Sequence, residues 1–79
     1  MLELYQLIQL TAIAECGTLS GAAEQLHLSQ PALSRSMQKL EDTLQVTLFD
    51  RQKNKIHLNR AGELAVAQAR RVIQQADDM

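Results

Sequence analysis

The sequence predicts a mainly α-helical domain: three helices, then a two-stranded β-hairpin, then a fourth, longer helix. Apolar residues recur at intervals of three and four through residues 3–44 and again from residue 60 onward. Between these stretches, apolar residues alternate with polar ones near both ends of residues 46–58, as in short strands. With 79 residues, 46% of them hydrophobic, the chain has room for one small domain.

The first two expected helices lie on either side of Gly17. The first covers residues 3–16, and Gly17 ends it. Its apolar face consists of Leu4, Leu7, Ile8, Thr11 and Ala14. Thr18 or Ser20 supplies the N-cap of the second helix, because either hydroxyl can accept a hydrogen bond from a backbone N–H. The buried stripe of this second helix consists of Ala22, Ala23 and Leu26.

Ser29 caps the third expected helix, and Pro31 lies in its first turn, where the missing N–H is not needed. The apolar face of this helix consists of Leu33, Met37, Leu40 and Leu44. Residues 27–29 form a short turn after the second helix, which is helix-turn-helix spacing. The opening turns carry Gln30, Ser34 and Arg35, a composition expected of a helix that recognises DNA.

The β-hairpin is expected over residues 46–58, with Val46 and Leu48 in one strand and Ile56 and Leu58 in the other. Residues 50–55 form its polar, basic tip, and such a hairpin after a helix-turn-helix unit is a wing. Asn59 then caps the final helix. The apolar stripe of the final helix consists of Leu64, Ala65, Ala69, Val72, Ile73 and Ala76. No helix-stop signal follows, so we expect a truncated chain or a further domain.

Charge is unevenly distributed along the chain. The net charge of −1 does not by itself favour a nucleic-acid partner. However, residues 1–34 carry three acidic and no basic side chains, whereas residues 35–60 carry six basic and three acidic ones. Contact with phosphates requires such local positive charge, because each neutralised phosphate releases counterions. The alternative is that these are solvated surface charges.

Several classes of function are not expected. Cys16 is the single cysteine, so we expect neither an internal disulfide nor a metal site. There is no long apolar run and no signal-peptide pattern, which favours a cytoplasmic protein without membrane contact. Neither a catalytic dyad nor a glycine-rich phosphate loop is present, so we expect no enzymatic activity and no cofactor.

The ordered motifs resemble the N-terminal domain of LysR-type transcriptional regulators, and the resemblance covers nearly the whole chain. It rests on residues 14–19 (AECGTL), 22–23 (AA), 29–34 (SQPALS), 40–41 (LE), 48–51 (LFDR) and 58–62 (LNRAG), with Leu26 and Leu44 between them.

The resemblance implies a winged helix-turn-helix domain over residues 1–59 and a linker helix over residues 60–79. Two linker helices would pack antiparallel through the apolar stripe, giving a homodimer that binds dyad-symmetric promoter DNA. The effector-binding domain that normally follows is not included in these residues. A small-molecule effector would act only through that domain, and the full-length protein would be a tetramer.

The resemblance also assigns residues. Gln30, Pro31, Ser34 and Arg35 match positions of the third helix that face the major groove, and Thr18 and Ser20 match positions near phosphate. Arg51 matches an arginine of the wing, where it contacts the DNA backbone or braces the wing internally. The full set of expected DNA-binding residues is Thr18, Ser20, Ser29, Gln30, Pro31, Ser34, Arg35, Gln38, Lys39, Arg51, Lys53, Asn54 and Lys55.

The sequence departs from the family pattern at four positions. Gln45 stands where glycine is usual; a positive φ there costs roughly 1 kcal/mol, unless the helix ends differently. Leu10 replaces a phenylalanine, and Asn59 replaces a threonine with the same capping ability. Asn54 replaces an arginine at the wing tip, so contact of Lys53 and Lys55 with phosphate is expected in place of minor-groove insertion.

Three alternatives remain open at this point. In the first, Arg35 forms a surface ion pair with Glu41 or Asp42 and does not contact DNA. In the second, the chain is a winged helix of another regulator family. The third alternative is a protein–protein interaction module without DNA affinity, in which the alanine-rich final helix is the interface.

Overall fold

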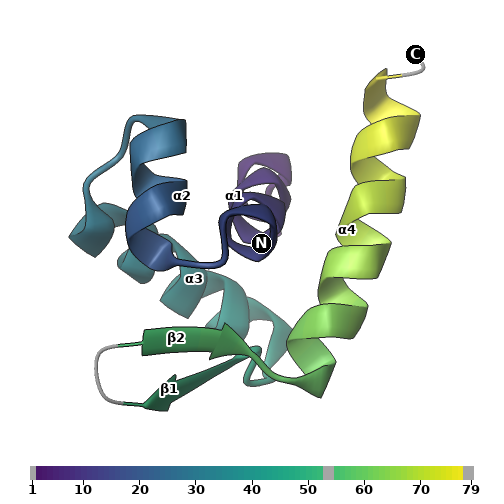
Figure 1. Cartoon of the computed structure of the whole chain (residues 1–79). Coiled ribbons are helices and arrows are strands. Elements are labelled where there is room, and N and C mark those ends of the chain that lie inside the picture. The colour runs from purple at the N-terminus through teal and green to yellow at the C-terminus, as the bar shows by residue number, and fades with distance from the viewer. Residues whose placement is uncertain (1, 53–54, 78–79) are drawn as a thin grey trace.

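The structure is a computed structural model that describes the backbone of residues 2–52 and 55–77 and the side chains of residues 2–50 and 57–75. Its elements follow the predicted order (Figure 1). They are α1 (Leu4–Cys16), α2 (Leu19–Leu26), α3 (Gln30–Leu44), β1 (Phe49–Gln52), β2 (Lys55–Leu58) and α4 (Arg60–Asp77). The predicted fold class, a mainly helical winged helix-turn-helix domain with a long C-terminal helix, is confirmed.

Local capping defines the helix-turn-helix unit formed by α2 and α3. The Thr18 hydroxyl accepts a hydrogen bond from the Gly21 N–H at 3.0 Å, so Thr18 and not Ser20 caps α2. Ser29 caps α3 in the same way, accepting from the Ala32 N–H at 3.2 Å. His27 ends α2 with a φ of 59°, a left-handed conformation that was not predicted.

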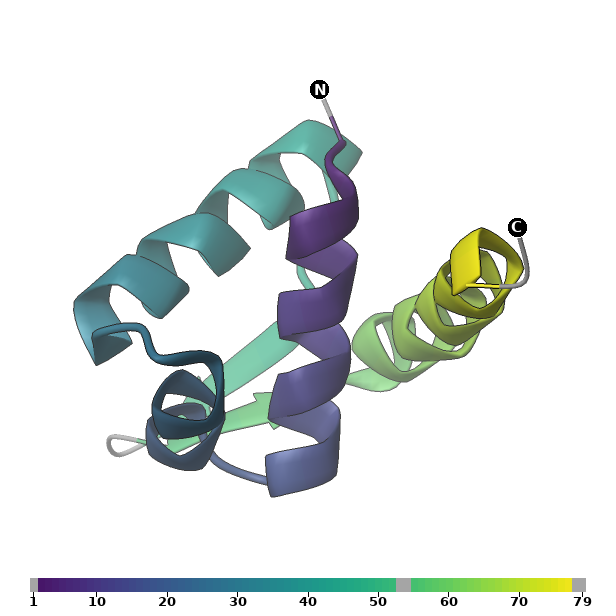
Figure 2. The ribbon, with the colours of Figure 1, turned by 90° about the horizontal axis from the view of Figure 1, so that it is seen from above.

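The hydrophobic core lies between α1, α2, α3, the N-terminal half of α4 and the start of the wing. Its largest fully buried side chains are Leu10, Leu33, Met37, Leu40 and Leu48. The apolar face predicted for α1 is confirmed at Thr11, which is buried, and at Ala14, which packs against the core. It is wrong at Leu4 and Ile8, which are 45% and 41% exposed. α1 contacts α2, α3 and α4, so it buries side chains around its circumference and not along one stripe (Figure 2).

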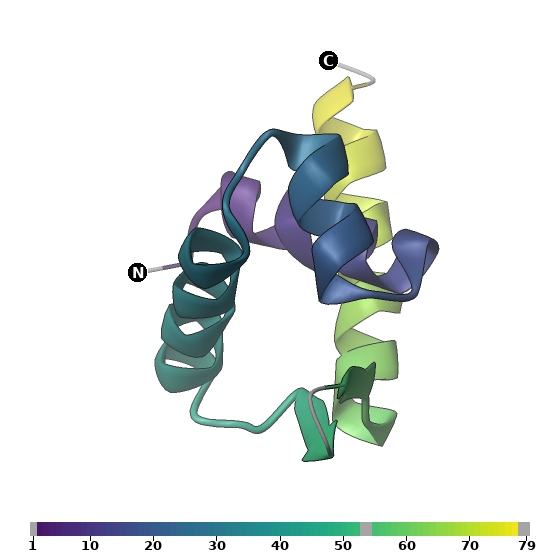
Figure 3. The same ribbon diagram turned by 60° about the vertical axis from the view of Figure 1, so that its left-hand side comes forward.

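The wing begins later than predicted. Phe49 pairs with Leu58 and Asp50 with His57 in an antiparallel ladder that extends to Gln52 and Lys55. Most of the polar segment that was expected to form the tip therefore lies in the strands. Val46 precedes the first strand and is exposed, and Leu44 at the end of α3 is exposed as well, contrary to its predicted place in the core. Figure 3 shows the hairpin beyond the C-terminal end of α3.

The predicted N-cap of α4 is confirmed. The Asn59 carboxamide oxygen accepts from the Gly62 N–H at 2.8 Å, and its Nδ2 donates to the Thr47 carbonyl oxygen at 2.8 Å. Gly62 lies against the chain before the wing: a Cβ atom there would stand 2.2 Å from the Leu48 carbonyl oxygen. The side chain of Asn59 and the close approach of Gly62 thus fix where α4 leaves the hairpin.

α4 packs against α1, and this packing narrows its predicted dimerisation face. Ala69 is only 2% exposed, and the half-buried Ala65 packs against the core, so both contribute to the interior of the single chain. Their expected part in a dimer contact stays a prediction. Leu64 and Val72 are 62% and 45% exposed. Ile73 is half-buried, and the side chain of Ala76 lies outside the described residues.

Candidate nucleic-acid interface

The N-terminal half of α3 presents polar side chains on the face opposite the core. Gln30, Pro31 and Arg35 are exposed and Ser34 is half-buried, whereas Leu33 and Met37 on the other face are buried. At 3.6 residues per turn, Pro31 and Arg35 are neighbours on the outer surface. The predicted arrangement of these residues is therefore present in the structure.

Arg35 does not form the ion pair considered as an alternative from sequence. Asp42 accepts a hydrogen bond from Gln38 Nε2 at 3.3 Å, and Glu41 Oε2 accepts from the Leu48 N–H at 2.8 Å. Among the side chains that the structure describes, Arg35 has no carboxylate partner. An exposed arginine without a partner is available to an external acceptor.

The two capping hydroxyls remain compatible with a second role. Thr18 and Ser29 each use a lone pair to cap a helix, which leaves the hydroxyl hydrogen available as a donor. Ser20 is exposed in the first turn of α2, where the helix dipole favours a negative group. These three positions suit contact with phosphate.

The two flanks of α3 differ in charge. On the side of α1 lies a hollow of about 270 Å³, here called the α1–α3 pocket, lined by Tyr5 and Gln9 from α1 and by Arg35 and Lys39 from α3, among others. On the side of β1 lies a shallower hollow, here called the acidic hollow, of about 790 Å³. Its lining residues include Gln38, Glu41, Asp42 and Asp50. An anion is therefore favoured on the α1 side.

Sequence reasoning missed Tyr5 and Gln9. The structure joins α1 to α3 through a hydrogen bond from the Ser36 hydroxyl to Gln9 Oε1. These partners lie 27 residues apart, so no local periodicity signals the contact. The exposure of Tyr5 was likewise not apparent from the sequence pattern.

None of the four wing residues of the predicted interface has a described side chain. The backbones of Arg51 and Lys55 lie in the strands, but their side chains lie outside the described residues. Lys53 and Asn54 lie outside the described residues altogether. Their expected contacts with DNA stay predictions.

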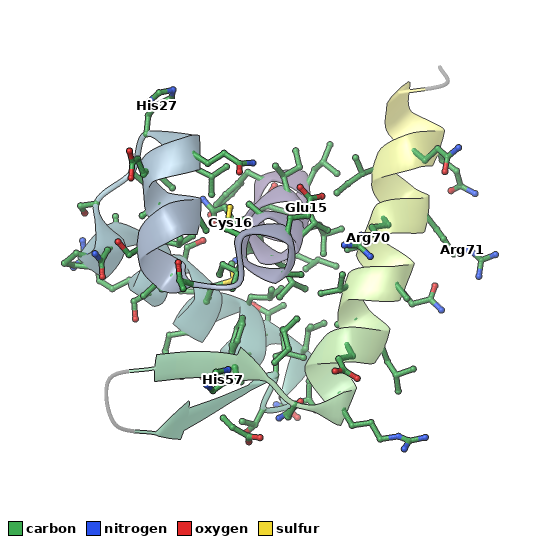
Figure 4. The ribbon with its side chains drawn as sticks, viewed as in Figure 1. Glu15, Cys16, His27, His57, Arg70 and Arg71 are labelled. Carbon is green, nitrogen blue, oxygen red and sulfur yellow. The ribbon has the colours of Figure 1, made fainter. Side chains whose placement is uncertain are left out.

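Other titratable side chains lie away from this surface. His27 projects from the end of α2, and Arg71 points away from the domain (Figure 4). The Cys16 thiol donates to Gln25 Oε1 at 3.0 Å. In the part of the chain that the structure describes, no cluster of His, Cys, Asp or Glu is suited to hold a metal ion, and no helix is long and apolar enough to cross a membrane.

The three-helix unit, the wing and the exposed polar start of α3 together define a winged helix-turn-helix domain of the regulatory type. The model of the bacterial regulatory helix-turn-helix proteins of the lysR family matches residues 4–63. The chain therefore belongs to the LysR family, and the alternative of another winged-helix family is excluded.

Curated relatives include an uncharacterised HTH-type transcriptional regulator from Azotobacter vinelandii, 40% identical over 98% of this chain and 54% of that protein. The HTH-type transcriptional regulator TcbR of Pseudomonas sp. (strain P51) is 41% identical over 95% of this chain and 26% of its own length. The chain thus spans about half of the first relative and about a quarter of the second.

Solved structures agree with this assignment. The CbnR_DBD–DNA complex has a TM-score of 0.92 at 40% identity, covering 98% of this chain and 88% of that one. The BenM_DBD/catB site 1 DNA complex has a TM-score of 0.92 at 29% identity and covers 99% of this chain and 84% of that one. A crystal structure of CbnR, described as a LysR family transcriptional regulator, has a TM-score of 0.90 at 40% identity and covers 98% of this chain and 27% of that one.

Proposed function

We propose that this chain binds double-stranded promoter DNA sequence-specifically and acts in transcription regulation. The observation that carries the proposal is Arg35, which is exposed beside Pro31 on the outer face of α3 and has no acidic partner among the described side chains. Gln30 is exposed at the start of the same helix. Two similar structures, of CbnR_DBD and BenM_DBD, are complexes with DNA, which supports this function. A regulator of this kind needs no catalytic group or cofactor.

In the proposed complex, α3 enters the major groove with its N-terminal half. Gln30 is suited to pair with adenine and Arg35 with guanine, because each presents two hydrogen-bonding groups in the geometry of those base edges. Ser34 contacts a base or sugar nearby. Gln38, one turn beyond Ser34, reaches the groove if it exchanges its hydrogen bond with Asp42 for one to DNA.

Phosphate contacts hold the domain in register on the duplex. Thr18, Ser20 and Ser29 supply hydroxyls at the starts of α2 and α3, and Lys39 supplies a charge one turn beyond Arg35. On the other side of the groove, the wing contributes the residues predicted from sequence, namely Arg51, Lys53, Asn54 and Lys55.

Residues 60–79 act as the linker helix, with residues 1–59 as the DNA-binding unit. Leu64 and Val72 lie two turns apart on α4 and are exposed, so they form the centre of the antiparallel dimer contact, flanked by Ile73 and Ala76. A dimer places two copies of α3 on two half-sites of a dyad-symmetric promoter. In a longer cytoplasmic protein, an effector-binding domain would follow, and dimers would associate into a tetramer.

Selection of bound duplexes from random DNA, followed by anisotropy titration at two salt concentrations, tests this function. We expect an enriched sequence with dyad symmetry, bound more tightly than a scrambled duplex, and affinity that falls steeply with salt. The protein–protein module predicts no enrichment and no salt-dependent binding to any duplex.

A further inference from the structure

The α1–α3 pocket lies beside the proposed recognition surface and is lined by two helices. Tyr5 and Gln9 come from the first and second turns of α1, and Arg35, Ser36 and Lys39 come from the middle of α3. Figure 2 shows α1 and α3 side by side. Arg35 takes part both in the pocket and in the exposed polar face of α3, so the pocket borders the surface that meets DNA.

The polar groups of the pocket are hydrogen-bond donors. Gln9 Oε1 already accepts from the Ser36 hydroxyl, so the group that Gln9 has left to offer is its NH₂. The Tyr5 hydroxyl, the Arg35 guanidinium and the Lys39 ammonium add three more donor groups. None of the lining residues is acidic. A pocket of this composition fits an anion with several acceptor oxygens.

Charge supports the same occupant. Arg35 and Lys39 are four residues apart on one helix, a spacing at which like charges repel. Among the described side chains neither has an acidic partner, because the carboxylates of α3 lie on the opposite flank at the acidic hollow. A bound anion removes the repulsion that the fold leaves in place.

We propose that the α1–α3 pocket binds one phosphate of the DNA backbone at the edge of the major groove that α3 enters. The proposal rests on the proposed function and extends its interface to α1. Tyr5 and Gln9 donate hydrogen bonds to the phosphate, Lys39 neutralises it, and Ser36 positions Gln9. Because a phosphate carries no sequence information, these residues contribute affinity without sequence preference.

Three substitutions test the proposal in anisotropy titrations against a selected duplex and its scrambled counterpart. Gln9→Glu keeps the oxygen that accepts from Ser36 but adds a negative charge, so we expect binding to both duplexes to weaken by about tenfold or more. Tyr5→Phe removes one hydroxyl and weakens both by roughly threefold to tenfold. Lys39→Gln removes one phosphate contact, so the plot of log affinity against log salt should become less steep, its negative slope shrinking in magnitude by about 0.9.

Gln74→Glu is the matched control, because it makes the same charge change on an exposed side of α4. Circular dichroism establishes that each variant is folded. The pocket assignment would be overturned if Gln9→Glu bound DNA as tightly as Gln74→Glu and Tyr5→Phe bound it as tightly as the wild type. The proposed function would remain intact in that case. Loss confined to the selected duplex would overturn the pocket assignment too, because it indicates a base contact. A wild-type chain that binds neither duplex would overturn the proposed function itself.

Tyr5 is the single tyrosine, so fluorotyrosine gives one fluorine NMR signal that reports on the pocket. We expect this signal to shift with both the selected and the scrambled duplex. A signal that shifts with inorganic phosphate but stays unchanged when DNA binds would contradict DNA as the source of the anion.

Discussion

Glu41 and Leu48 join the C-terminal end of α3 to the start of the wing. Glu41 Oε2 accepts a hydrogen bond from the Leu48 N–H at 2.8 Å, and both residues are buried. The contact fixes the chain between α3 and β1, while the neighbouring Leu48 carbonyl oxygen accepts from the Asn59 N–H at 2.9 Å. One residue thus connects the helix proposed to enter the groove, the wing and the start of α4.

Removing the Glu41 carboxylate should destabilise the domain. Glu41→Ala leaves the Leu48 N–H buried without its acceptor, and we expect a loss of about 2 kcal/mol in the free energy of unfolding. Glu41→Gln keeps a neutral acceptor and should lose less. Urea unfolding followed by circular dichroism measures both, and an alanine variant as stable as the wild type would show that the contact contributes nothing.

Glycine at the two left-handed helix ends should stabilise the domain. His27 and Gln45 have φ values of 59° and 54°, conformations that cost a side-chain-bearing residue roughly 1 kcal/mol or more. Gln45→Gly and His27→Gly should each raise the free energy of unfolding by about 0.5 kcal/mol, and with it the melting temperature. The gain is smaller than the strain relieved, because glycine also increases the entropy of the unfolded chain. Gln45→Ala keeps the strain and should bring no gain; equal effects of alanine and glycine would refute strain as the cause.

A methyl group at Gly62 should be strongly destabilising. Its Cβ would stand 2.2 Å from the Leu48 carbonyl oxygen, so α4 must move away from the wing. We expect Gly62→Ala to cost at least about 2 kcal/mol. Gly17→Ala is the comparison: it meets nothing within 4 Å and carries only the strain of its φ of +78°, about 1 kcal/mol. Thermal melts that rank Gly17→Ala as the more damaging variant would contradict this packing.

A charge on the exposed face of α4 should prevent dimerisation. Leu64→Glu and Val72→Glu alter side chains that are 62% and 45% exposed, so the fold of the single chain should remain intact. In sedimentation equilibrium we expect the wild type to dimerise and both variants to stay monomeric. A wild type that remains monomeric at high protein concentration would refute dimerisation of this chain.

The parts of the fold that were predicted correctly depend on local chemistry. Thr18, Ser29 and Asn59 cap helices through side chains that reach N–H groups three residues away, and such contacts are visible in sequence. The apolar face predicted for α1 was wrong at Leu4 and Ile8, because α1 packs against three other helices. The spacing of apolar residues within one helix does not show which elements lie around it. The start of the wing was misplaced because Val46 alternates with Leu48 as in a strand, although only Leu48 is buried.

The candidate site likewise contains residues that could be predicted from the sequence and residues that could not. Gln30, Ser34 and Arg35 follow a cap and a proline within one helix, so their common position could be inferred from spacing alone. Tyr5 and Gln9 reach the same region through packing of α1 on α3, a contact between residues distant in sequence.

The central claim is that Arg35 reads DNA from the outer face of α3. Its most direct test is the affinity of Arg35→Ala for a selected duplex and for a scrambled one, measured by anisotropy beside Arg71→Ala as a control that removes the same charge from α4. We expect Arg35→Ala to lose about 1–3 kcal/mol on the selected duplex, to lose less on the scrambled duplex, and so to lower the specificity ratio. Equal losses for the two arginine variants, with an unchanged specificity ratio, would contradict the account.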